Sequence, residues 1–69
     1  MQKDLVTVEY YAGPDELVGA VYVPKKSAAD SAQIVGRSLN VALGRNELTA
    51  HILDCDGNLM NEMIIFRRR

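Results

Sequence analysis

An Asp-Gly pair at residues 56–57 separates two apolar runs, residues 47–54 and 59–66, and constrains the fold more than any other feature. Asp-Gly favours the backbone conformation of a tight β-turn, and between apolar runs it is the strongest short-range signal of a β-hairpin. The two runs are therefore predicted to be antiparallel strands.

The register of this hairpin follows from which face would be buried. A two-residue loop places His51 opposite Glu62 and Ala50 opposite Met63. One face then carries six apolar side chains, namely Leu48, Ala50, Ile52, Leu59, Met63 and Ile65, with Leu48 opposite Ile65. A three-residue bulged loop would instead turn Glu62 toward that apolar face, which is less consistent with burial. We therefore expect the two-residue loop.

The N-terminal part of the chain predicts a second hairpin. Residues 5–11 are rich in β-branched and aromatic side chains, and their alternation places Val6, Val8 and Tyr10 on one side. Residues 17–23 form another apolar run, and residues 12–16 between the two runs contain a Pro-Asp pair typical of a β-turn.

The segment between the two hairpins predicts one helix. Ser27 and Asp30 form an imperfect capping box, so the helix should begin near Ala28, and Gly44 occupies the position of a left-handed C-cap. An apolar stripe at helical spacing comprises Ala28, Ala32, Val35, Leu39, Ala42 and Leu43.

These elements predict an α+β domain of the two-layer ββαββ type, with antiparallel hairpins forming a sheet and one helix on one face. The 69 residues suffice for a single domain, and residues 67–69 form a basic C-terminal tail.

One helix covers only one face of a sheet, and the other face would also be apolar. Six residues are expected to form an interaction surface there: Val18, Ala20, Tyr22, Met60, Ile64 and Phe66. Exposed apolar patches of this kind mark protein interfaces, and the simplest partner is a second copy, bound sheet to sheet or edge to edge. We therefore expect a homodimer.

Composition narrows the cellular setting. With Cys55 as the single cysteine, no internal disulfide can form, which fits a reducing compartment. No run approaches the roughly 20 apolar residues of a membrane helix, and residues 1–4 lack the features of a secretory signal. The chain is expected to be soluble and cytoplasmic, without a membrane partner.

Two oxygen-rich motifs overlap at the Asp-Gly turn. An apolar strand followed by Asp54, Cys55, Asp56 and Gly57 resembles the first motif of haloacid-dehalogenase-type phosphatases. That resemblance implies Asp54 as nucleophile and Asp56 as general acid, with magnesium. That family also needs a large parallel domain with later motifs, whereas ten residues follow Leu59 here. A calcium loop would need its glycine and its bidentate glutamate at other positions. Turn chemistry is the preferred interpretation.

Other catalytic constellations are not evident in the sequence. His51 and Cys55 are four residues apart on one strand, about 13 Å, which is too far for a nucleophile and its base. His51 is instead expected to form a cross-strand polar pair with Glu62. We expect no catalytic residue, no cofactor and no metal, and hence no enzyme.

Two function classes remain. The first is a non-enzymatic protein–protein interaction module, an accessory or inhibitor of a larger assembly. The alternative is a nucleic-acid-binding accessory protein that uses Arg67, Arg68 and Arg69 with Lys25 and Lys26. The net charge of −1 gives no overall attraction to nucleic acid, so the first class is preferred.

Overall fold

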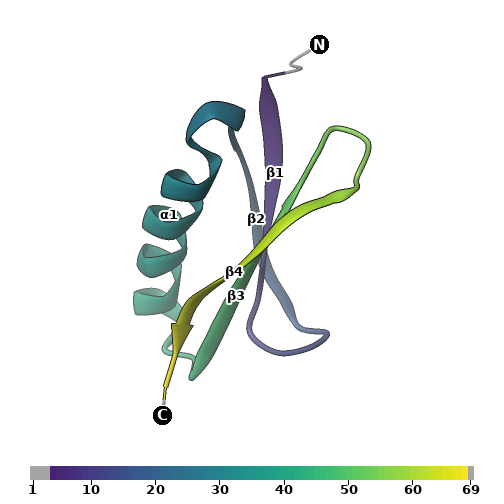
Figure 1. The fold of residues 1–69 in the computed structure, drawn as a ribbon. Coiled ribbons are helices and arrows are strands. Elements are labelled where there is room, and N and C mark those ends of the chain that lie inside the picture. Colours follow the sequence, from purple (N-terminus) through teal and green to yellow (C-terminus); the bar gives the residue numbers. More distant parts are fainter. Residues whose placement is uncertain (1–3, 69) are drawn as a thin grey trace.

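Two β-hairpins lie side by side in one sheet, and a single long helix covers one face of it (Figure 1). The structure is a computed structural model that describes residues 4–68. Its elements are β1 (Leu5–Tyr11), β2 (Leu17–Pro24), the 3-10 turn η1 (Lys25–Ser27), α1 (Ala28–Leu43), β3 (Glu47–Leu53) and β4 (Leu59–Arg67). The predicted ββαββ α+β fold is confirmed.

The strands follow the spatial order β2-β1-β3-β4, and all neighbours are antiparallel. The first strand of each hairpin is therefore central, and the second lies at an edge. Neither helix in the described part of the chain is long and apolar enough to cross a membrane.

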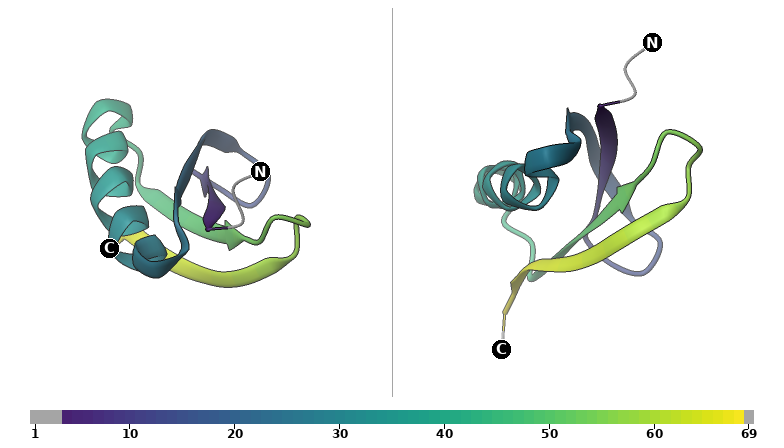
Figure 2. Two further views of the ribbon diagram at one scale, coloured as in Figure 1. Left: turned by 90° about the horizontal axis from the view of Figure 1, so that it is seen from above. Right: turned by 45° about the horizontal axis from the view of Figure 1, so that its top comes forward.

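The core lies between α1 and the two central strands, because these strands are covered by neighbours on both sides. Alternate residues of β1 and β3 are buried under the helix: Val6, Val8, Tyr10, Leu48, Ala50 and Ile52. The helix contributes Ala28, Ala32 and Gly36 to the contact, and such small residues let its backbone approach the sheet closely. Both views of Figure 2 show the helix against one side of the sheet.

Tyr10 is the largest fully buried side chain and fixes the distance between the layers. Its hydroxyl donates a hydrogen bond of 2.8 Å to the backbone carbonyl of Ala32. A β-carbon built on Gly36 would lie 2.8 Å from Ile65 Cγ2 and 2.9 Å from Tyr10 Cε1. Only glycine fits at this position without displacing one of those side chains.

The helix ends agree only in part with the prediction. Gly44 adopts the expected left-handed conformation, with φ 65°, and its N–H donates to the Asn40 carbonyl at 2.7 Å. Ser27, by contrast, makes no side-chain capping bond, so the expected capping box is wrong. Leu43 is exposed, so the stripe that packs on the sheet ends at Leu39.

The loop between β3 and β4 differs from the prediction. Asp54 N–H donates to the Asn58 carbonyl at 2.9 Å and Gly57 N–H to the Asp54 carbonyl at 3.0 Å, which encloses three loop residues. Gly57 has φ 85°, the left-handed conformation that closes such a loop. The expected two-residue loop is therefore wrong.

The predicted pairing of His51 with Glu62 nevertheless holds, because β4 contains an extra residue. Leu53 pairs with Leu59, but Ile52 pairs with Asn61, so Met60 forms a β-bulge. The bulge shifts the register by one residue and thereby cancels the effect of the longer loop.

A second bulge in β4 changes the end of the strand. Thr49 pairs with Ile64, but Leu48 pairs with Phe66 rather than with Ile65 as expected. Ile65 is buried and contacts the helix at Gly36, and Phe66 lies opposite the buried Leu48. Leu59, expected in the core, is 57% exposed.

Candidate functional site

The sheet face opposite α1, here called the open face, carries no covering element within residues 4–68. Strand pairing arranges its side chains in three rows that run from β2 across to β4. The first row is Tyr22, Thr7, Leu53 and Leu59; the middle row is Ala20, Glu9, His51 and Glu62; the third row is Leu17, Tyr11, Thr49 and Ile64.

The first and third rows are largely apolar and most exposed at the sheet edges. Tyr22 is 77% exposed, and Leu17, Leu59 and Ile64 are each more than half exposed. Leu5 and Cys55 flank the first row, where they line a shallow hollow together with Thr7 and Tyr22. These are side chains that a binding partner could remove from water.

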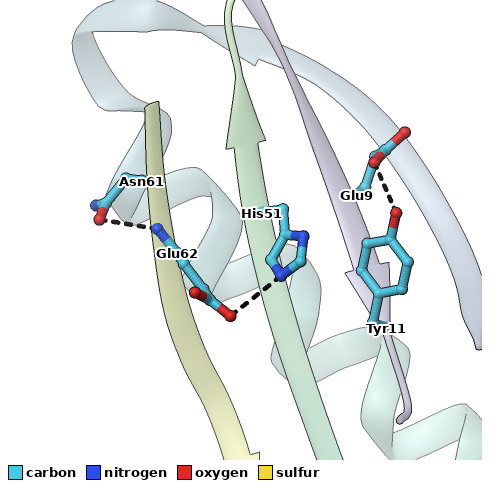
Figure 3. Close-up of polar contacts among 5 residues, drawn as sticks. All are labelled: Glu9, Tyr11, His51, Asn61 and Glu62. Carbon is cyan, nitrogen blue, oxygen red and sulfur yellow. Dashed lines mark hydrogen bonds and ion pairs between the residues drawn. The ribbon is translucent and has the colours of Figure 1, made fainter. Parts of the chain in front are cut away.

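The middle row is polar, and Tyr11 of the third row connects Glu9 with His51 (Figure 3). The Tyr11 hydroxyl donates to Glu9 Oε1 at 2.9 Å, and the Tyr11 and His51 rings lie 4.7 Å apart between centroids. His51 Nε2 lies 3.2 Å from Glu62 Oε2. Contacts therefore run continuously from Glu9 on β1, across β3, to Glu62 on the edge strand β4.

These contacts orient the two carboxylates. The backbone N–H of Glu62 donates to the Asn61 Oδ1 at 2.9 Å, so the edge strand is held locally as well as across the sheet. The hydrogen bond to Glu9 raises the pKa of Tyr11, and desolvation and the charge of Glu9 act in the same direction. Tyr11 thus stays a neutral donor, and Glu9 stays held in place.

Acidic groups outnumber basic groups on the open face of the described chain. Glu9 and Glu62 lie in the middle row, and Glu47 lies beyond the third row opposite Arg67. Among residues 4–68, Arg67 is the one lysine or arginine that strand pairing places on this face. The face therefore combines two apolar rows with an anionic centre.

The structure brings together only some of the predicted interaction residues. Ala20, Tyr22 and Ile64 share the open face. Val18 does not, because it lies at a bulge of β2 and packs against the core. Phe66 does not either, because the second bulge of β4 places it opposite Leu48 on the helix side. Met60 lies in the first bulge and is 46% exposed.

The basic residues that a nucleic-acid site would need lie in two separate places. Lys25 and Lys26 precede the first turn of α1, whereas Arg67 and Arg68 lie at the end of β4, near the C-terminal end of the helix (Figure 1). The 16 residues of α1 separate these places by about 24 Å. Arg69 lies outside the described residues.

The Asp-rich turn is organised by its own backbone. Asp54 Oδ1 accepts the N–H groups of Asp56 at 2.9 Å and Asn58 at 2.8 Å. These bonds, that of Asn58 foremost, lower the pKa of Asp54. Among residues 4–68, no three His, Cys, Asp or Glu side chains are grouped as metal ligands. The two bonds that Asp54 Oδ1 accepts stabilise the turn.

Sequence reasoning identified the His51–Glu62 pair but missed its extension to Glu9 and Tyr11. That extension depends on β1 lying beside β3, and no turn connects these two strands. The alternation of Thr7, Glu9 and Tyr11 on one side of β1 was the available signal, because it marks the less apolar face of a central strand.

Comparison of the chain with family models, curated proteins and solved structures finds no match.

Proposed function

We propose that this chain is a small non-enzymatic protein-binding module whose open face engages a partner protein, as an accessory or inhibitor of a larger assembly. The supporting observation is the uncovered sheet face, with apolar rows on either side of an oriented polar row. Exposed apolar area of this kind, enriched in tyrosine, is typical of protein interfaces.

The edges of the sheet are less suited to binding than its face. Both edge strands contain bulges, at Val18 in β2 and at Met60 and Ile65 in β4. Bulges interrupt the regular row of hydrogen-bonding groups that an added strand would need, and natural proteins use them to blunt sheet edges. A partner is therefore expected on the face.

The nucleic-acid alternative has less support. Its basic residues lie at opposite ends of α1, so Lys25 and Lys26 do not form one continuous basic surface with Arg67 and Arg68. The alternative would require salt-sensitive retention on DNA or RNA that depends on the C-terminal arginines.

Site-specific cross-linking tests the proposal. A photo-reactive amino acid at Thr49, on the open face, should form a covalent adduct in cells that express the chain, and mass spectrometry identifies its partner. The same amino acid at Ser38, exposed on the helix, is the control and should form much less adduct. Tyr22→Asp in the Thr49 variant should reduce the adduct, because it places a charge in the first row.

An adduct of twice the chain's mass would identify the partner as a second copy, as the sequence suggests. Equal adducts at the two positions, or none at Thr49, would contradict binding through the open face.

A further inference from the structure

We propose that the open face binds a basic amphipathic helix of a partner protein, with a lysine or arginine over the middle row and apolar side chains over the first and third rows. This inference rests on the proposed function and adds the chemistry of the partner.

The charge of the middle row selects a cation. Glu9 and Glu62 lie on strands separated by β3, so their backbones are about 9.6 Å apart, and a cation over His51 approaches both carboxylates. Tyr11 and His51 already hold these carboxylates in place, which reduces the ordering cost of binding. Electrostatic complementarity of this kind gives an interface its specificity.

The spacing of the rows matches a helix. Successive rows are two residues apart along the central strands β1 and β3, or about 6.7 Å. Four residues of an α-helix rise about 6 Å, so partner positions i, i+4 and i+8 reach the three rows in turn. A helix laid along the strands would repeat on the open face the arrangement that α1 has on the other face (Figure 2).

The size and charge of the face favour one helix over a second copy of the chain. Four strands of seven to nine residues give a twisted face of roughly 20 by 20 Å (Figure 2). One helix is about 10 Å wide and fits this face. A twofold axis at the centre would also bring two acidic middle rows together, which opposes face-to-face pairing.

A pair of synthetic peptides tests this proposal on the intact chain. One helical peptide carries leucine at positions i and i+8 and lysine at i+4, with alanine and polar residues at its other positions. The second peptide is identical except that glutamate replaces the lysine at i+4. NMR titration of the isotope-labelled chain should show the lysine peptide shifting the backbone signals of Glu9, His51 and Glu62. Its affinity should exceed that of the glutamate peptide by about fivefold or more and should fall with added salt.

Two variants separate charge from fold. Glu9→Gln combined with Glu62→Gln should remove most of the preference for lysine, because the shape is kept and the charge is lost. Asp30→Asn, which removes an exposed carboxylate of the helix, is the matched control and should leave the preference unchanged.

Each outcome that contradicts the proposal identifies which part of it is wrong. Equal binding of the two peptides to the open face would overturn the cation proposal but leave the proposed function standing. Shifts elsewhere on the chain, or no binding by either peptide, would also overturn it. A second copy cross-linked at Thr49 would replace the helix as occupant, whereas no adduct at Thr49 would remove the proposed function itself.

Discussion

Replacing Gly36 by alanine measures how closely the helix approaches the sheet. In an ordinary exposed helix position the change stabilises by about 1 kcal/mol, because alanine has the higher helix propensity. Here the new methyl group would lie 2.8 and 3.0 Å from two carbons of Ile65 and 2.9 Å from Tyr10 Cε1. Overpacking of a close-packed core costs about 1–3 kcal/mol. The expected net effect is a loss of about 1 kcal/mol, or about 4–8 °C in Tm.

Urea and thermal unfolding followed by circular dichroism give this value, and a second variant tests its cause. Ile65→Ala removes the side-chain carbons responsible for two of the three close contacts. In that background Gly36→Ala should cost less or become stabilising, since the methyl group then occupies space that Ile65 has left. Stabilisation of the otherwise unchanged chain by the full helix propensity would refute the close approach.

Four further outcomes are expected. Tyr10→Phe should lower the free energy of unfolding by about 1 kcal/mol in urea titrations, because the bond to the Ala32 carbonyl is lost. Burial raises the pKa of Tyr10 above its ordinary value of 10.0, so the unfolded chain releases this proton first. Stability should therefore fall as pH rises above about 10, less steeply in Tyr10→Phe. Backbone hydrogen bonds lower the pKa of Asp54 below 3.8, so the charged carboxylate stabilises the folded chain above that pH. This stabilisation should be lost as pH falls through the pKa of folded Asp54. The stability of Asp54→Asn should therefore depend less on pH between about pH 5 and pH 2. Deleting Met60 should preserve cooperative unfolding, because it only removes a bulge. Deleting His51 should abolish cooperative unfolding, because it shifts the register of the regular central strand β3. Loss of folding in both variants would contradict the bulge assignment.

The elements themselves could be predicted because several local signals agree at each of them. Strict alternation identifies Val6, Val8 and Tyr10 as the core side of β1, and these residues are buried. A glycine after an apolar helical stripe identifies the end of α1, and Gly44 has the left-handed conformation that this position requires. Where propensity, periodicity and turn chemistry point to the same structure, tertiary contacts need not override any of them.

The contacts between layers could not be predicted to the same extent. Gly36 carries no side chain, so hydrophobic periodicity does not mark it as part of the core, although its close approach to Tyr10 sets the position of the helix. The pairing of β1 with β3 joins two strands from different hairpins, and neither sequence contains a signal for its neighbour. Such long-range pairing follows from packing the whole domain rather than from local residues.

The composition of the open face depends on the two bulges of β4, and no sequence signal predicts either bulge. With the three-residue loop and no bulge, Glu62 would oppose Ala50 on the helix side, where its carboxylate would be removed from water. Met60 supplies the extra residue that returns Glu62 to His51, so the anionic row exists because the strand is irregular. The second bulge sends Phe66 to the helix side and places Arg67 opposite Glu47 instead. The edge that the sequence predicts to be apolar is therefore more polar, and the proposed choice of a basic partner depends on the acidic centre of the open face.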